Sequence, residues 1–348
     1  MINKETGYIK LNKFAATTER EFEDALHRLP LDNMKNMIID LRNNPGGYML
    51  AADSLADNFL SGQMLVVYMK GRTTPKEEFK STGKGLFPST KLIVLIDEGS
   101  ASASEIFAGA VQDWDRGVVI GRRSFGKGLV QNGFYLTDGS QIRLTIARYY
   151  TPTGRSIQSP YNEGYDKYMA NFAKRFTDGE LMSADSVHFP DSLKYFTKVN
   201  RRVVYGGGGI MPDVFVAADT TNYSDYYRDL IRKGVFNSFI LEYVDKNRAK
   251  IKSAYPSFYD FRERFTFSDE EVNLFIKDGE KAGVKFKEKD FAVSKNEILK
   301  ILKALVVNDV WQTTEYFRII NEGDPVIEKA LKVLGDDKGY KKILGYKF

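Results

Sequence analysis

The segment LIVLIDEGSASASEIFAGAVQDW, residues 92–114, joins a continuous apolar run to a helical pattern through a loop with three serines. The run at 92–96 is typical of a strand buried on both faces of a parallel sheet, and 102–114 is predicted to be helical. Open α/β folds place their sites at the carboxyl ends of such strands. The N–H groups at a helix start also stabilise a developing anion. The serines therefore lie where a site is expected, although a flexible Ser/Ala loop is the plain alternative.

The flanking sequence continues the alternation of strand and helix and predicts a mixed, mostly parallel α/β sheet. Further strands are predicted at 7–11, 37–41, 64–68, 118–120 and 214–216, further helices after 18 and over 49–60, and a hairpin over 129–150. Residues 158–203 lack a clear period and are interpreted as an insertion. Lys- and Glu-rich helical segments follow at 225–246, 268–282 and 293–322. We therefore expect a core domain over 1–218 and a helical C-terminal domain over 219–348.

Composition narrows the classes of function. The 348 residues are 43% apolar and 13% aromatic, which is enough for a packed core. The net charge of +5 is spread along the chain, and no basic run indicates a nucleic-acid partner. No apolar stretch reaches the length of a transmembrane helix, and the N-terminus lacks a signal-peptide pattern. There is no cysteine, and the two histidines, His27 and His188, lie in no motif that indicates a metal site.

A reactive serine needs a base, and histidine is scarce here. A neutral lysine can take that role in Ser–Lys variants of the catalytic triad. The best candidate is Lys127, in GRRSFGKG at 121–128, where two flanking glycines permit a tight backbone path. The plain alternative is a solvated loop lysine. The same segment matches the first seven positions of a phosphate-binding P-loop, but Gly128 stands where the hydroxyl is required and a strand pattern follows.

The segment DLRNNPGG, residues 40–47, is a glycine turn after a predicted strand. Most turns of this composition have no role beyond reversing the chain. The functional interpretation is that N–H groups exposed by the glycines form an oxyanion hole.

Taken together, these segments resemble the C-terminal processing (tail-specific) proteases of peptidase family S41. The resemblance covers roughly residues 7–217. It is carried by GYIKLNKF (7–14), DLRNNPGG (40–47), GSASASEIFAGAVQD (99–113), GRRSFGKGLVQ (121–131), ARYYTPTGRSIQ (147–158) and GGGGIMPDV (206–214). It implies the layered α/β core of the crotonase/ClpP type, followed here by a helical region.

The resemblance also implies the site residues. The middle serine of SASAS, Ser102, corresponds to the nucleophile, and Lys127 to its general base. Gln131 corresponds to a glutamine that orients the lysine. The oxyanion donors correspond to Ala103 N–H and one glycine of the NPGG turn, with Gly46 and Gly47 both open. Asp113 matches an acidic position used in some members, and a structural role for it is an equal alternative.

The implied activity is that of a serine endopeptidase with a Ser–Lys dyad and an acyl-enzyme, without cofactor or metal. Its substrates would be proteins or peptides with exposed or unstructured C-termini, in the bacterial cell envelope (periplasm); a homo-oligomer is left open. A catalytically silent scaffold that binds peptide tails is the alternative, and an acyl-CoA enzyme of the crotonase type would not need the Ser–Lys pair. Family members usually carry a PDZ domain just before the segment matching 7–14. Either this chain is a fragment of a longer protein, which we favour, or the protein lacks that domain.

Overall fold

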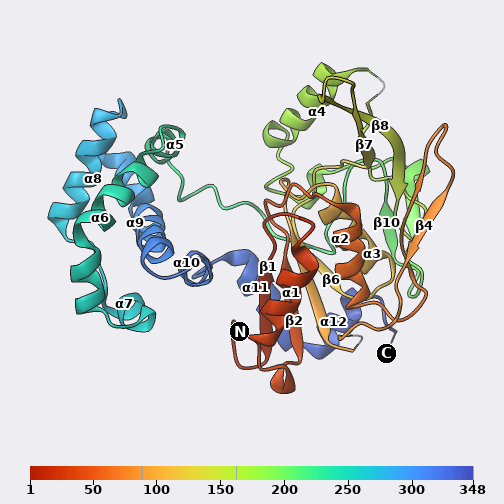
Figure 1. Ribbon diagram of the computed structural model, residues 1–348, viewed down its shortest axis with the longest axis horizontal. Helices are drawn as coiled ribbons and strands as arrows, with labels where there is room; N and C mark the ends of the chain where they lie inside the picture. Colours follow the sequence, from red (N-terminus) through yellow and green to blue (C-terminus); the bar gives the residue numbers. More distant parts are fainter. Residues whose placement is uncertain (88, 162, 348) are drawn as a thin grey trace. The chain divides into compact units, whose positions relative to one another are not determined.

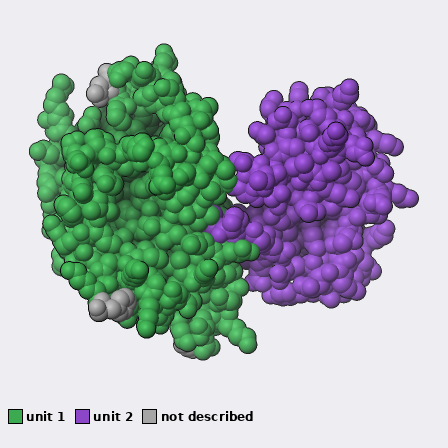
Figure 2. All heavy atoms as spheres, turned by 180° about the vertical axis from the view of Figure 1, so that it is seen from behind, with its two compact units in different colours: residues 1–218, 328–348 green, residues 219–327 purple. Residues whose placement is uncertain are grey.

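The computed structural model describes residues 1–87, 89–161 and 163–347. These form two compact units: residues 1–218 with 328–348, and residues 219–327 (Figure 2). The sequence predicted that everything after residue 218 belongs to one helical domain. The structure differs at the C-terminal end, because 328–348 packs with the first unit.

The first unit is built on five parallel strands in the order β1, β2, β5, β6, β11 (Figure 1). They are β1 (Thr6–Lys10), β2 (Asn36–Asp40), β5 (Lys91–Ile96), β6 (Val118–Gly121) and β11 (Val214–Phe215). β2 and β5 are direct neighbours, with Ile39 opposite Val94. The two loops that follow these strands, with the NPGG turn and the three serines, therefore leave the same edge of the sheet.

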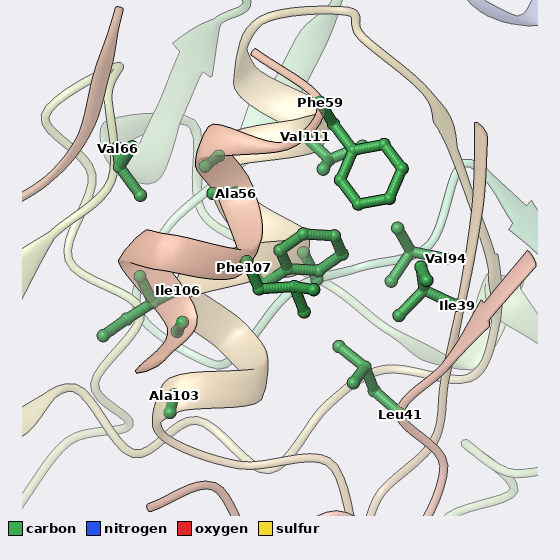
Figure 3. Packing of buried hydrophobic residues seen from close by; sticks show 14 of the residues in the cluster. Ile39, Leu41, Ala56, Phe59, Val66, Val94, Ala103, Ile106, Phe107 and Val111 are labelled. Carbon is green, nitrogen blue, oxygen red and sulfur yellow. The ribbon is translucent and has the colours of Figure 1, made fainter. Parts of the chain in front are cut away.

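Three helices connect these strands, and all three bury side chains in one core with the sheet: α1 (Thr18–His27), α2 (Met49–Asp57) and α3 (Ala103–Asp113). Every residue of α3 is buried. Figure 3 shows Phe107 of α3 among side chains of α2 and the sheet, and its ring meets that of Phe59 edge-on with centroids 5.9 Å apart. Burying one such aromatic side chain stabilises the fold by roughly 1.5–3 kcal/mol. The helix that follows the serine loop is thus firmly held.

A second, antiparallel sheet has the order β4, β3, β8, β7. Its strands are β3 (Leu65–Lys70), β4 (Glu77–Lys80), β7 (Leu129–Tyr135) and β8 (Gln141–Tyr150). The hairpin over 129–150 was predicted. The apolar run at 64–68 does form a strand, but it pairs antiparallel with β4 and β8 instead of joining the parallel sheet.

In its described residues, the expected insertion at 158–203 contains an α-helix, two 3-10 turns and a short strand. The α-helix is α4 (Tyr165–Thr177), and the strand is β9 (Lys194–Phe196), which pairs antiparallel with β10 (Val203–Tyr205). The fold class is therefore the expected mixed α/β architecture with a parallel sheet.

The second unit is helical. Its helices are α5 (Asp225–Arg232), α6 (Val235–Ala254), α7 (Phe258–Arg264), α8 (Asp269–Lys281), α9 (Glu288–Val310) and α10 (Thr313–Ile320). The predicted helix over 225–246 is two helices, because Gly234 adopts a left-handed conformation with φ 68°. Aromatic rings fill the core of the second unit, and the ring centroids of Phe239 and Phe275 lie 5.3 Å apart.

Two more helices lie near the end of the chain, α11 (Pro325–Gly335) and α12 (Asp337–Ile343). Tyr340 of α12 is buried, and its hydroxyl accepts from Leu92 N at 3.0 Å and lies 3.1 Å from Leu92 O. These contacts with β5 explain why 328–348 belongs to the first unit. In the described part of the chain, none of the helices combines the length and the apolarity that crossing a bilayer requires.

Candidate active site

Ser102 stands between β5 and α3, directly before the first residue of the helix. Its backbone has φ 55° and ψ −114°, a conformation that costs a residue with a side chain about 1–3 kcal/mol. The residue is half-buried. Because α3 is buried along its whole length, the strained turn is held at a fixed point at the edge of the parallel sheet.

The two neighbouring serines have structural partners. The Ser100 hydroxyl donates to Leu41 O at 2.8 Å, and the Ser104 hydroxyl donates to Asn44 O at 3.0 Å. Both side chains are fully buried. They join the serine loop to the segment after β2, so Ser102 is the serine of the three that reaches toward the surface.

The NPGG turn lies directly against Ser102. A Cβ atom added to Gly46 would be 2.7 Å from Ser102 Cβ and 2.8 Å from Ala103 N. Gly46 also has φ 91°, which favours glycine. This close approach of backbone to backbone is possible only without a side chain at position 46.

The turn leaves one of its two glycine N–H groups free. Gly46 N–H donates to the side-chain oxygen of Asn44 at 2.9 Å. Within the described residues, neither Gly47 N–H nor Ala103 N–H has a hydrogen-bond acceptor. Ala103 is the first residue of α3, where backbone N–H groups lack an intrahelical partner. The free donors beside Ser102 are therefore those of Ala103 and Gly47.

Glu105 of α3 ties the serine loop to the lysine loop. Its carboxylate accepts from Ser102 N at 2.8 Å and from Lys127 N at 2.9 Å. It also accepts from Gly126 N at 2.7 Å and from the Ser124 hydroxyl. Burial raises the pKa of Glu105, and these hydrogen bonds counteract the rise. One buried side chain thus holds the N–H groups of both predicted catalytic residues.

Tyr149 of β8 holds the same two residues through their carbonyl oxygens. Its hydroxyl lies 3.0 Å from Ser102 O and 2.5 Å from Lys127 O. The side chain is 1% exposed, and burial raises its pKa well above the ordinary value, so the phenol keeps its proton and remains a donor. Together, Glu105 and Tyr149 fix the separation between the Ser102 and Lys127 backbones.

The side chains of the predicted catalytic residues are not hydrogen-bonded to one another. Within the described residues, no hydrogen bond links Ser102 Oγ to Lys127 Nζ, although both residues are half-buried. Gln131 lies on β7 opposite Thr145, its side chain is exposed, and it makes no hydrogen bond to Lys127 in the part of the chain described.

Asp113 lies at the opposite end of α3 from Ser102. It is fully buried, pairs with Arg155 at 2.7 Å, and accepts from the Thr153 N–H and hydroxyl at 2.9 and 2.8 Å. These contacts support the structural interpretation of this residue. The P-loop pattern at 121–127 leads into the strand β7 rather than a helix, so the context that phosphate binding requires is missing.

Sequence reasoning missed Asn44, Glu105 and Tyr149. Glu105 left a signal, because it follows Ser102 by three residues, the spacing at which a helix-start acid reaches back to a backbone N–H. Asn44 and Tyr149 left none, since their partners are backbone atoms brought close only by the fold.

A strained serine before a buried helix, beside two free N–H groups, is typical of serine hydrolases. Residues 5–182, more than half of the chain, match the model of peptidase family S41. The chain belongs to peptidase family S41. Residues 226–312, in the helical unit, match a second model, described as a family of unknown function (DUF8443).

Individual relatives match over part of their length. The chain is 42% identical over 151 residues to a carboxyl-terminal-processing protease of Synechocystis sp., covering 43% of this chain and 35% of the relative. It is 39% identical over 152 residues to the chloroplastic carboxyl-terminal-processing peptidase 3 of Arabidopsis thaliana, covering 44% of this chain and 29% of the relative. The chain thus spans about a third of these relatives. A photosystem II D1 C-terminal processing protease of known structure is 35% identical, covering 44% of this chain and 39% of that one, with a TM-score of 0.41.

Proposed function

We propose that the protein is a serine endopeptidase in which Ser102 is the nucleophile and Lys127 the general base. The observation that carries the proposal is the double bridge of Glu105 and Tyr149 between the backbones of these two residues. A nucleophile and its base must be held in a fixed relation to react, and a separation fixed by buried groups meets that need.

The reaction proceeds by acyl transfer. Ser102 Oγ attacks the peptide carbonyl carbon while its proton moves to the neutral amine of Lys127. Lys127 then gives that proton to the leaving nitrogen as the C–N bond breaks, which leaves an ester on Ser102. Water then attacks the ester carbon while its proton moves to the same lysine. Lys127 returns that proton to Ser102 Oγ as the acyl C–O bond breaks, which restores the serine hydroxyl and releases the new carboxylic acid, which ionises in water. Each step balances without a cofactor or metal.

The negative oxygen of the tetrahedral intermediate is assigned to the N–H groups of Ala103 and Gly47. Gly47 is preferred over Gly46, because the Gly46 N–H is already bonded to Asn44. Removing one such donor typically lowers kcat by about 10²–10³. Gly46 then serves by allowing the turn to approach Ser102.

Substrate selection follows from the second sheet and from the relatives. β7 is an edge strand that begins two residues after Lys127, so an extended peptide can add to its free edge. Because the relatives are named for carboxyl-terminal processing, we propose proteins with exposed or unstructured C-termini as substrates. The same resemblance supports the bacterial cell envelope as the location. It also supports the assignment of Gln131 as the residue that orients Lys127, which requires its exposed side chain to turn toward the lysine.

The test is labelling with a fluorophosphonate, which reacts with activated serines, followed by peptide mapping. The wild-type protein is expected to carry the label on Ser102, and Ser102→Ala to carry none. Lys127→Arg should lose nearly all labelling, because arginine stays protonated and cannot act as a base. Lys84→Arg, at an exposed loop lysine, is the matched control and should label as the wild type does. A folded wild-type protein that does not react at Ser102 would favour the silent tail-binding scaffold instead.

A further inference from the structure

The loop that carries Lys127 has no regular hydrogen-bonded structure of its own. Residues 122–128 form neither helix nor strand between β6 and β7. A lysine amine at the end of a flexible four-carbon side chain is correctly placed only if its backbone is held. The groups that hold the rest of this loop therefore bear directly on the proposed chemistry.

Arg175, in the last turn of α4, grips the start of this loop. It is 7% exposed, and its guanidinium donates to Arg123 O at 2.7 Å and to Ser124 O at 2.9 Å. Its Nε donates to Glu180 at 2.7 Å. Glu180 is itself buried and binds the Arg123 side chain at 2.7 Å, so one carboxylate orients both arginines.

Aromatic packing fixes the next residue of the loop. The ring of Phe125 contacts that of Phe172 with centroids 4.5 Å apart and that of Tyr168 at 6.1 Å. Both rings belong to α4. Aromatic pairs in such offset or edge-on geometry add about 0.5–1.5 kcal/mol beyond the area they bury.

The segment before α4 holds the glycines on either side of Lys127. Gly126 O accepts from Ser159 N at 3.0 Å, and Gly128 N donates to the Gln158 side chain at 2.8 Å. Every residue from 123 to 128 except Lys127 is thus contacted by residues 158–180. Lys127 itself is held by Glu105 and Tyr149, as described above.

We propose that α4 is a positioning element for Lys127 and that Arg175 is the residue through which it acts. The proposal rests on the proposed function of Ser102 and Lys127. Arg175 touches no reacting atom; it sets the carbonyls of the loop, and the loop sets the lysine. A displacement of about 1 Å in such a supporting group can lower a rate by about 10²-fold. The segment interpreted as an insertion thus has a role in placing the proposed general base.

The experiment separates binding of the fluorophosphonate (KI) from its reaction with Ser102 (kinact) in the full chain. Arg175→Lys keeps the charge but loses the planar fork that reaches two carbonyls. We expect kinact to fall at least about tenfold while KI changes by less than about twofold. A cavity of about 140 Å³ between α4 and the loop adjoins Arg175, so guanidinium ion at non-denaturing concentration should partly restore kinact in Arg175→Ala.

The matched control is Arg116→Lys. Arg116 also grips backbone carbonyls, those of Phe59, Phe87 and Thr90, but away from the lysine loop. The Arg116→Lys substitution should lower the thermal stability and leave kinact unchanged. Should the Arg175 variants fail to fold, Phe172→Leu weakens the same support through Phe125 and should lower kinact alone.

The outcomes are distinct. Absence of wild-type labelling overturns the proposed function. If the wild type is labelled normally, two results overturn the role of α4. One is that folded Arg175 variants react at the wild-type kinact, and the other is that Arg116→Lys loses kinact to the same extent as they do. If the Arg175 variants do not fold, a wild-type kinact in Phe172→Leu likewise overturns the role of α4.

Discussion

Position 46 illustrates how one missing side chain shapes the candidate site. Gly46 has a positive φ, its N–H is bonded to Asn44, and its α-carbon lies against Ser102 and Ala103. The turn can therefore bring the free N–H of Gly47 close to the serine. At this scale the site depends on backbone atoms more than on side chains.

We predict that Gly46→Ala reacts with the fluorophosphonate at least about 10²-fold more slowly than the wild type, because the new methyl group must displace Ser102 or Ala103. Gly139→Ala is the control. Gly139 has a similar φ of 84°, but no atom lies within 4 Å of an added Cβ, so alanine there carries only the backbone strain of about 1–2 kcal/mol. Equal labelling rates and melting temperatures for the two variants would contradict the prediction.

The family resemblance assigned the SASAS and NPGG segments to one site but did not identify the atoms that join them. In the structure the two segments lie in contact through Ser102 and Gly46. The bridge made by Tyr149 could not be predicted, because its partners are carbonyl groups shared by every residue type. The roles of Ser102, Lys127 and Gln131 stay predictions.

At the scale of elements, apolar patterning predicted where strands occur better than which sheet they join. The run at 92–96 entered the parallel sheet as expected, whereas the equally apolar run at 64–68 joined the antiparallel sheet. Burial of both faces gives similar patterns in either sheet, so only pairing partners far along the chain separate them. The insertion contains α4, in which Tyr168 and Phe172 contact Phe125 of the lysine loop. These aromatic residues do recur at helical spacing, and that period was not recognised in the sequence.

Helix α2 contains a partly buried carboxylate, Asp53, whose charged form is destabilised by its surroundings. Asp53 has an oxygen that is buried without a hydrogen-bond partner in the described residues. Burial, with the negative charge of Asp57 close by, raises the pKa of Asp53 to about 6. Because this pKa exceeds the unfolded value, the unfolded state loses the proton first, and folding stability falls as the pH rises toward 6.

We therefore predict that Asp53→Asn melts about 2–4 °C higher than the wild type at pH 8, about 1 kcal/mol after allowance for solvent screening. The gain should shrink as the pH falls from 6 toward 4. Thermal unfolding of both proteins across this range measures it. A gain that is constant with pH, or a loss at pH 8, would show that Asp53 does not carry this penalty. Asp57→Asn is not a substitute, because Asp57 bonds Thr82.

At the scale of the whole molecule, the helical unit is inserted within the sequence of the first unit, which is discontinuous. The chain leaves the first unit after Ala218 and has returned to it by Glu328. Tyr340 then bonds to Leu92 at the start of β5. Residues 328–348 thus complete the sheet-bearing unit, although they are separated from it by more than a hundred residues of sequence.

We predict that a chain of 1–218 joined to 328–348 by a flexible Gly/Ser linker folds and labels at Ser102. A chain of 1–218 alone should be less stable by about 3 kcal/mol or more, because it loses buried side chains such as Tyr340 and Leu344. Chemical denaturation of both shortened chains gives the difference. Equal stabilities would mean that 328–348 contributes nothing to the first unit, and an unfolded joined chain would mean that the helices are needed for folding.

The discontinuity of the first unit also determines what a single backbone cut can do. A single cut anywhere in the helical unit breaks the covalent connection between 1–218 and 328–348. The two pieces would still be joined by hydrogen bonds, those of Leu92 with Tyr340 and of Asn200 with Leu344. The two pieces then form a complementing pair, held together without a peptide bond. One cut by another protease would therefore loosen the helical unit, while the serine loop, the lysine loop and the residues that hold them stay assembled.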